Sequence, residues 1–330
     1  MLIRLLLALP LLAAAAAVPW IHFSLGGDAA LDAPVVVEIP RGTGTMQALR
    51  GLRDRGLIGD PWAALVWLKA ARGGRPIRAG EYEFRGTVSP RGVLDKLLRG
   101  EVLLHRVAFP EGDTLFEHGR TLERAGLCPA AGFEAAALDP GPARRFAPEA
   151  SDLEGFLFPE TYAFPKGLAP RRMAEAMVAH FEKVLRLHEA EVGAAGLTPL
   201  EWATLASIVE REARVTGEKP VIAGVFLNRL RRGMPLQADP TVLYAFERRG
   251  VTVARLTRLD LAVDSPYNTY RRAGLPPGPI GNPGRESLLA VLRPVEHDLL
   301  YFVATGLGTH VFAATLEEHN RNVAAQRRRR

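Results

Sequence analysis

The chain has 330 residues, enough for two domains with substantial buried cores. Hydrophobic residues make up 48% and charged residues 24%, which is typical of a globular protein and excludes a largely disordered chain. The net charge of +6 suits nucleic acid, an anionic membrane surface or an anionic polymer, and the single cysteine, Cys128, excludes an intrachain disulfide framework and a cysteine-rich metal site.

The first feature along the chain is an uncharged segment from Leu5 to Phe23. As a helix it would span roughly 28 Å, close to the thickness of a bilayer core. Arg4 precedes the segment and Asp28 follows it, so the positive-inside rule places the short tail in the cytoplasm and the remainder outside. We therefore expect a cytoplasmic tip and transmembrane anchor over residues 1–25. The small residues at 13–17 leave a cleaved signal peptide open as the alternative.

A short linker, 26–34, leads into a small region, 35–109, in which strand and helix patterns alternate. The predicted elements are strands over 35–40, 77–84 and 102–109, and helices over 45–56, 61–68 and 90–98. The order strand, helix, helix, strand resembles a LysM-like α+β module, a fold that commonly holds N-acetylglucosamine polymers. A spacer that binds no ligand is the alternative for this region.

The rest of the chain is predicted to be mainly helical. Residues 110–150 are rich in Ala, Pro and Gly, which indicates a connecting segment, and 151–324 form the second domain, followed by a basic tail over 325–330. The predicted elements are helices over 170–192, 199–213, 220–230 and 315–324, and a hairpin over 299–304 and 310–313. The fold class is therefore α+β, with a mainly helical second domain that contains a few strands.

Two acids lie in the apolar helical sequence Leu-Ala-Ser-Ile-Val-Glu-Arg-Glu over 205–212. Glu210 and Glu212 are ~200° apart on a helix, so they cannot both face one site. With the apolar positions turned inward, Glu212 lies at one edge of the apolar face and Glu210 on the other flank. The geometry of the helix prefers Glu212 only slightly.

Two polar motifs follow the acids: Gly-Met-Pro-Leu-Gln-Ala-Asp over 233–239, and Ser-Pro-Tyr-Asn over 265–268. The order of acid, Gly…Gln and Tyr-Asn resembles the lytic transglycosylases, which carry Glu-Ser, Gly-Leu-Met-Gln and Ala-Tyr-Asn. Leu-Glu-Gly-Phe-Leu-Phe-Pro-Glu-Thr-Tyr over 153–162, Val-Phe-Leu-Asn-Arg-Leu over 225–230 and Gly-Leu-Pro-Pro-Gly-Pro-Ile over 274–280 are similar to the endolytic murein transglycosylases of the YceG-like (MltG) family. The resemblance runs from about Val35 to Asn322.

The resemblance implies a catalytic acid and a set of substrate-side residues. Glu212-Ala213 occupies the place of the family's Glu-Ser, so Glu212 is the first choice for the acid and Glu210 the second. Alanine in place of serine removes a hydroxyl that could have tuned the acid. The residues expected on the substrate side are Gly233, Met234, Gln237, Asp239, Tyr267 and Asn268.

The implied activity is an endolytic lyase that cuts the bond between N-acetylmuramic acid and N-acetylglucosamine in nascent peptidoglycan and leaves 1,6-anhydro ends. By the same resemblance it terminates glycan elongation beside peptidoglycan synthases, in the cell inner membrane, with its catalytic domain in the periplasm. No cofactor or metal is expected, and no nucleic acid, because the basic residues are not interleaved with aromatics. Two alternatives remain: a non-catalytic peptidoglycan-binding membrane protein, and a muramidase-type hydrolase that pairs Glu212 with a second carboxylate such as Asp239.

Overall fold

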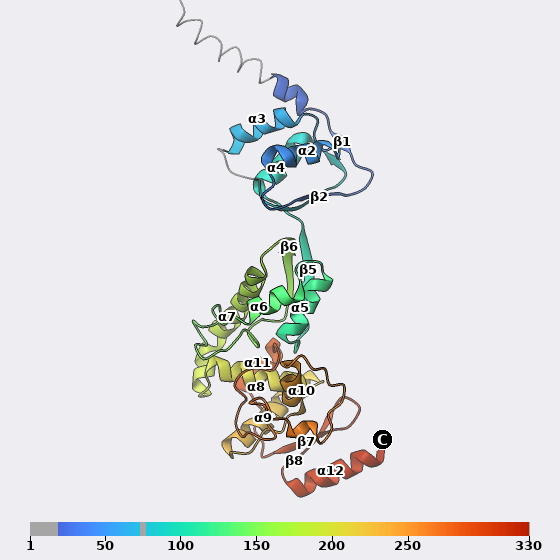
Figure 1. The fold of residues 1–330 in the computed structure, drawn as a ribbon. Coiled ribbons are helices and arrows are strands. Elements are labelled where there is room, and N and C mark those ends of the chain that lie inside the picture. The colour runs from blue at the N-terminus through green and yellow to red at the C-terminus, as the bar shows by residue number, and fades with distance from the viewer. Residues whose placement is uncertain (1–18, 73–76, 330) are drawn as a thin grey trace, which may run out of the picture. The chain divides into compact units, whose positions relative to one another are not determined.

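The computed structural model describes residues 19–72 and 77–329, and these divide into two compact units. Unit 1 contains the described residues up to His105 together with Ala163–Leu168. Unit 2 contains Arg106–Tyr162 and the described residues from Ala169 onward. Both units combine helices with short two-stranded sheets, so the fold is α+β, as the sequence predicts (Figure 1).

Unit 1 contains two antiparallel strand pairs and the helices that cover them. The strands are β1 (Ala29–Ala30), β2 (Val35–Ile39), β3 (Gly80–Phe84) and β4 (Thr87–Val88), and the helices are α2 (Thr45–Arg53), α3 (Pro61–Arg72) and α4 (Pro90–Arg99). β1 pairs with β4, and β2 pairs with β3. Side chains alternate between core and surface along β2 and β3, so Val37 and Tyr82, which face each other across the pair, are both buried. The predicted order strand, helix, helix, strand is thus confirmed for β2, α2, α3 and β3.

The ends of two helices in unit 1 follow from local sequence. Ser89 caps α4 by accepting a hydrogen bond from the Gly92 amide at 3.1 Å, and Pro90 occupies the first turn. Asp60 accepts from the Trp62 amide at 2.8 Å at the start of α3. Both helices then bury their apolar positions in one core with β2 and β3.

Unit 2 is mainly helical. Its helices are α5 (Leu115–Arg124), α6 (Ala130–Ala137), α7 (Pro170–Ala194), α8 (Pro199–Glu212), α9 (Lys219–Arg231), α10 (Asp239–Glu247), α11 (Arg285–Leu292) and α12 (Leu316–Arg329), with 3₁₀ turns η1 (Thr216–Glu218) and η2 (Asp260–Ala262). Its strands are β7 (Tyr301–Ala304) and β8 (His310–Ala313), while β5 (Leu104–Ala108) pairs with β6 (Thr161–Pro165) where the chain passes between the units. The predicted helices α7, α8, α9 and α12 and the predicted hairpin are confirmed, but the sequence patterns do not predict α10 and α11.

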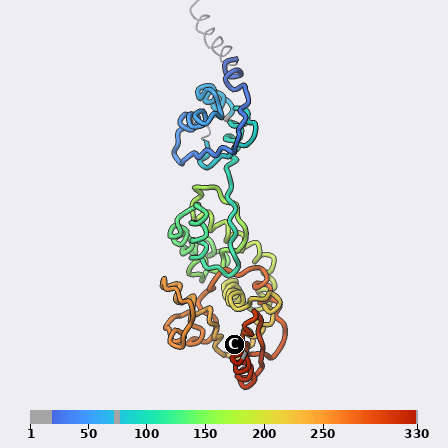
Figure 2. Tube along the Cα trace, turned by 90° about the vertical axis from the view of Figure 1, so that its right-hand side faces the viewer, coloured from blue at the N-terminus to red at the C-terminus, as the bar shows by residue number. Residues whose placement is uncertain are grey.

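Helix α8 is the centre of unit 2, because α7, α9, α10 and α11 all pack against it. Trp202 of α8 is fully buried, and its Nε1 donates to the Leu288 carbonyl of α11 at 2.9 Å. The β7–β8 hairpin and α12 pack together and form one end of the unit, where α12 appears in red in both views (Figures 1 and 2).

Among the helices within residues 19–72 and 77–329, none alone has the length and apolar character needed to cross a bilayer. Only α7 and α8 taken together reach that length and composition, and they are bent by 99° at the break between them. The predicted anchor, Leu5–Phe23, falls for the most part outside the described residues.

Candidate active site

Glu212 is the last residue of α8, and the local sequence defines both ends of this helix. Thr198 and Glu201 form a capping box, in which the Thr198 amide donates to Glu201 at 2.8 Å and the Glu201 amide donates to Thr198 Oγ1 at 3.2 Å. At the other end Ala213 has a ψ of 120°, so the backbone becomes extended directly after Glu212. The rigid helix therefore delivers the Glu212 side chain at a defined point.

A cavity of about 660 Å³ lies at this end of α8. Its volume falls within the range of about 300–1,000 Å³ that is typical of ligand sites in proteins. Glu212 lines the cavity with residues from the turn before α10, from β7 and β8, and from α12. The polar residues in its wall include Arg229, Gln237, Asp239, Tyr270, Tyr301 and Asn320.

The carboxyl group of Glu212 has a pKa well above that of a solvated glutamate. Loss of solvation, and to a smaller extent the negative charge of Asp239, raise its pKa to about 8, while the positive charge of Arg229 acts in the opposite direction. Within the described part of the chain, this carboxyl makes no hydrogen bond to another residue. It is therefore protonated near neutral pH and free to donate its proton to a bound molecule.

Glu210 has a different environment, because its carboxylate is fully used inside the protein. It pairs with Lys219 Nζ at 2.9 Å, and it accepts hydrogen bonds from the Gly284 amide at 2.9 Å and the Ser287 hydroxyl at 2.7 Å. Its side chain is 8% exposed and that of Lys219 is 6% exposed. Glu210 therefore joins α8 to α9 and to the first turn of α11, on a different side of the helix from Glu212.

Asp239 and Tyr270 form a second polar group in the wall of the cavity. The Tyr270 hydroxyl donates to Asp239 Oδ1 at 2.5 Å, and Asp239 is the first residue of α10. This hydrogen bond fixes the carboxylate of Asp239 at the start of α10, beside Glu212 in the cavity wall. The sequence motifs point to Asp239, but they miss Tyr270, which lies two residues after the Tyr-Asn motif.

Arg229 is a further cavity residue that the sequence motifs do not single out. It is buried, and its guanidinium donates to the carbonyls of Leu300 at 2.6 Å and Leu236 at 2.8 Å. It also lies over the ring of Tyr301, 5.1 Å from the ring centre. The signals in the sequence are its place in the motif over 225–230 and its position, next to Asn228, in the mainly apolar run 222–230 of a predicted helix. Arg229 fixes the turn before α10 to the start of β7, and thereby shapes two walls of the cavity.

Gln237 reaches the cavity through an uncommon backbone conformation. Its φ is +53°, the only positive φ of a non-glycine residue among the described residues. The turn that contains Thr269 holds this conformation, since the Gln237 amide donates to the Thr269 carbonyl at 3.1 Å and the Ala238 amide to Thr269 Oγ1 at 3.1 Å. The Gln237 side chain is exposed at the cavity, where its amide can bond a polar ligand.

The other predicted substrate-side residues lie elsewhere in the described structure. Tyr267 is buried against the ring of Tyr244, at 5.0 Å between ring centres, and burial raises its pKa to about 12. Asn268 is fully buried, and its Nδ2 donates to the Leu261 and Val263 carbonyls at 3.0 and 2.8 Å. Gly233 and Met234 lie in the turn after α9, outside the cavity wall. The structure therefore brings Gln237 and Asp239 to Glu212, and does not bring these four residues there.

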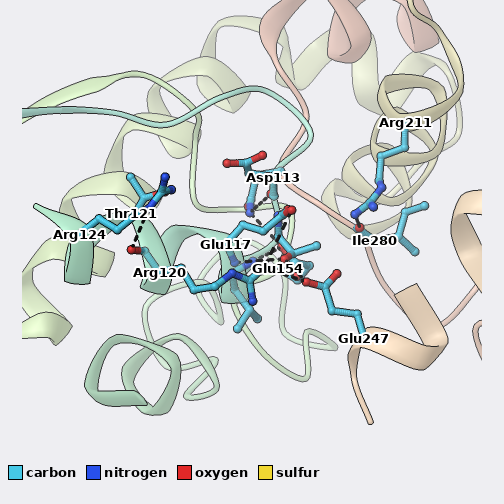
Figure 3. A network of polar contacts seen from close by, with 12 residues as sticks. Asp113, Glu117, Arg120, Thr121, Arg124, Glu154, Arg211, Glu247 and Ile280 are labelled. Atoms are coloured by element: carbon cyan, nitrogen blue, oxygen red, sulfur yellow. Dashed lines mark hydrogen bonds and ion pairs between the residues drawn. The ribbon is translucent and has the colours of Figure 1, made fainter. Parts of the chain in front are cut away.

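A buried acid, Glu154, organises the neighbouring part of unit 2 (Figure 3). Its carboxyl accepts hydrogen bonds from the Leu115 amide at 3.0 Å, the Tyr244 hydroxyl at 3.0 Å and Asn282 Nδ2 at 2.9 Å. Burial, and to a smaller extent the negative charge of Asp152, raise its pKa to about 8. Because these contacts are all with the protein, Glu154 holds α5, α10 and the segment before α11 together. Among the described residues, no three side chains of His, Cys, Asp and Glu are grouped as metal ligands would be.

Sequence similarity to known proteins extends along most of the chain. Residues 37–325 match the sequence profile of the YceG-like family. The chain is 42% identical over 170 residues to the endolytic murein transglycosylase of Bacillus subtilis (strain 168), covering 51% of this chain and 46% of that protein. It is 30% identical over 320 residues to the endolytic murein transglycosylase of Streptococcus pneumoniae (strain R6), covering 88% of this chain and 58% of that protein. The chain thus spans about half the length of these relatives.

A solved structure has a similar fold. The crystal structure of a YceG-like protein from Listeria monocytogenes superimposes with a TM-score of 0.60 at 33% sequence identity. The matched region covers 88% of this chain and 99% of that structure.

Proposed function

Because this chain belongs to the YceG-like family, we propose that it is an endolytic lytic transglycosylase that cuts peptidoglycan. The single observation that carries the proposal is the placement of Glu212: a partly buried carboxyl with a pKa raised to about 8, in a ligand-sized cavity, with no partner among the described residues. The names of the relatives from Bacillus subtilis and Streptococcus pneumoniae support the choice of substrate.

The proposed reaction uses Glu212 first as an acid and then as a base. The protonated carboxyl gives its proton to the oxygen that bridges C1 of N-acetylmuramic acid and the next N-acetylglucosamine, and the C1–O bond breaks. The resulting carboxylate takes the proton of the muramic acid C6 hydroxyl, and O6 forms a new bond to C1. The products are a 1,6-anhydro end and a free C4 hydroxyl, and no water is consumed. The internal hydroxyl gains from its proximity to C1.

The residues around Glu212 support this use of the cavity. Gln237 offers an exposed amide for the N-acetyl or hydroxyl groups of a sugar. Asp239, fixed by Tyr270, keeps a negative charge that favours the protonated form of Glu212 and can stabilise positive charge at C1 during bond cleavage.

A second candidate function is a muramidase-type hydrolase, which one observation favours: Asp239 shares the cavity with Glu212 and could activate a water molecule. Digestion of purified glycan strands, followed by mass spectrometry of the products, separates the possibilities. We expect anhydro-muramic acid ends, whose mass is lower than that of reducing ends by one water. Reducing ends alone would establish the hydrolase and refute the lyase, and uncut strands would indicate a binding protein.

The pH profile provides a prediction for Asp239. Glu212 acts as an acid while it is protonated, so activity should fall as the pH rises through about 8. Asp239→Asn removes a charge that raises the pKa of Glu212, and should therefore move this fall in kcat/KM to lower pH. The control is Asp264→Asn, because Asp264 is 81% exposed on the loop before Tyr267. An unchanged profile in Asp239→Asn would show that Asp239 does not influence the acid.

We also propose that the enzyme is held at the cell inner membrane by the segment Leu5–Phe23, with both units in the periplasm. The absence of charge in this segment and the exposure of Trp20 and Phe23, at 41% and 87%, support this position. We expect the full-length chain to stay in the membrane pellet after a high-salt wash. A soluble product that begins near Trp20 would instead show that the segment is a cleaved signal peptide.

In this proposal unit 1 is a LysM-like module that holds glycan, and unit 2 cuts it. The support is the order β2, α2, α3, β3 together with a cavity of about 440 Å³ lined by Arg85, Ser89 and Lys96, whose donors suit a sugar polymer. Cleavage of nascent strands at the membrane would terminate glycan elongation, so peptidoglycan synthases are the proposed protein partners.

A further inference from the structure

A second cavity in unit 2, of about 480 Å³, lies beside α8 and shares no lining residue with the cavity that holds Glu212. Residues of α5, α6, α8 and α10 and the chain over 250–253 form its wall. Arg211 is its contribution from α8. Because successive residues on a helix are about 100° apart, Arg211 and Glu212 point to different sides of α8. The ionised side chains in the wall are Arg120, Glu134, Arg211, Glu247 and Arg248.

Ion pairs within the protein neutralise only some of these charges. Arg248 pairs with Asp152 at 2.7 Å, and Arg120 lies 3.4 Å from Glu247. Arg211 and Glu134 remain: neither has an ion-pair partner within 4 Å among residues 19–72 and 77–329. The cavity therefore presents one cation and one anion without an ion-pair partner, although Asp113 is close enough to Arg211 for their charges to interact.

The guanidinium of Arg211 is held in place with most of its donors unused. Its Nη1 donates to the Ile280 carbonyl at 3.0 Å (Figure 3). Its aliphatic stem packs against two glycines. If Gly281 carried a side chain, its Cβ would lie 3.4 Å from Arg211 Cδ, and a Cβ on Gly112 would lie 3.9 Å from Arg211 Cγ. A fixed guanidinium with free N–H groups can bind a carboxylate through two parallel hydrogen bonds.

Glu134 is held in a comparable way on α6. A Cβ built on Gly119 of α5 would lie 3.3 Å from Glu134 Cγ and 3.4 Å from its Oε1, so the glycine makes room for this side chain. The carboxylate makes no hydrogen bond to another described residue, and it can accept from an ammonium group. Phe116 and Val251 line the same cavity and give it apolar surface for aliphatic groups.

We propose that this cavity binds the peptide branch of peptidoglycan, with a carboxylate of the peptide on Arg211 and an ammonium group on Glu134. The inference rests on the proposed function, which brings the polymer to unit 2. The short peptide attached to the lactyl group of N-acetylmuramic acid carries free carboxylates, methyl side chains and the amine of a diamino acid. This combination matches the paired opposite charges and the apolar surface of the cavity. The enzyme would thus recognise strands that still carry their peptides.

The test compares two forms of the same substrate: glycan strands that bear peptides, and strands from which an amidase has removed them. The full-length enzyme should have a lower KM for the peptide-bearing strands. Arg211→Gln and Glu134→Gln should each raise that KM by about tenfold or more, since each removes a charge-assisted hydrogen bond. Neither substitution should change kcat/KM on the stripped strands. The matched controls are Arg214→Gln and Glu189→Gln, which replace exposed residues of unit 2.

Three outcomes would overturn the inference. The first is an equal KM of the unaltered enzyme for the two substrates, and the second is an unchanged KM in both variants. The third is an equal loss of activity on both substrates, which would mean that Arg211 acts through Glu212 or through folding. Glu134→Gln, on a different helix, keeps the test valid if Arg211→Gln does not fold. If no anhydro ends are formed at all, the proposed function fails. The affinity of the full chain for peptide-bearing and for peptide-free strands, measured by co-sedimentation, would then still decide whether the cavity binds the peptide.

Discussion

Replacement of Glu212 by glutamine is expected to lower the rate of anhydro-product formation by on the order of 10²–10⁴. The amide has nearly the same shape as the acid, but it cannot deliver a proton to the bridging oxygen. Binding should persist, because the walls of the cavity formed by Arg229, Gln237 and Tyr270 are unchanged. Single-turnover digestion followed by mass spectrometry measures the rate, and co-sedimentation with insoluble peptidoglycan measures binding.

The matched control for this experiment is Glu210→Gln, two residues earlier on α8. Its amide can still accept from the Gly284 amide and the Ser287 hydroxyl, so activity should stay within about tenfold of the unaltered enzyme at a temperature where the variant is folded. An inactive Glu210→Gln with an active Glu212→Gln would move the acid to the other side of the helix and refute the assignment.

Replacement of Glu210 by alanine is expected to reduce the free energy of unfolding by about 3–5 kcal/mol. The substitution leaves Lys219 Nζ, 6% exposed, without its nearest counter-ion, and Glu111 at 3.7 Å is the remaining one. It also removes the acceptor for the first turn of α11. Urea unfolding of the full chain, followed by circular dichroism, measures the loss.

Two further variants define how the loss arises. Glu189→Ala, at an exposed position of α7, should change the free energy of unfolding by less than about 0.5 kcal/mol. The double variant Glu210→Gln with Lys219→Met removes both charges together, and should be more stable than Glu210→Ala because no unpaired charge stays buried. A loss below about 1 kcal/mol in Glu210→Ala would mean that Lys219 finds another partner or water.

The elements with strong local signals could be predicted from the sequence. Ser89-Pro90 and Asp60-Pro61 define the starts of α4 and α3, and the apolar spacing of α7 and α8 defines their buried faces. Helices α10 and α11 have only nine and eight residues, too short for a clear apolar period. Their stability comes from packing against α8, and this contact is long-range in sequence.

For the candidate site too, only some of the residues could be predicted from the sequence. Periodicity could name two acids on α8, but it could not tell that Glu210 would meet Gly284 and Ser287, more than seventy positions later in the chain. The Tyr-Asn motif directed attention to Tyr267 and Asn268, whose polar groups serve the loop itself or lie in the core. Tyr270 and Arg229 reach the cavity through turns and carbonyl contacts that no local pattern encodes.

The position of Glu212 at the very end of α8 has an electrostatic consequence. The peptide dipoles of a helix add along its axis, and the last turn carries roughly half a unit of negative charge on its unpaired carbonyls. A carboxylate at that point is repelled, whereas its protonated form is not. Arg211, in the same turn, gains from the same field. Extension of α8 past Ala213 by a helix-favouring segment would therefore lower the pKa of Glu212 and leave less of it protonated near neutral pH, even with every residue of the cavity in place.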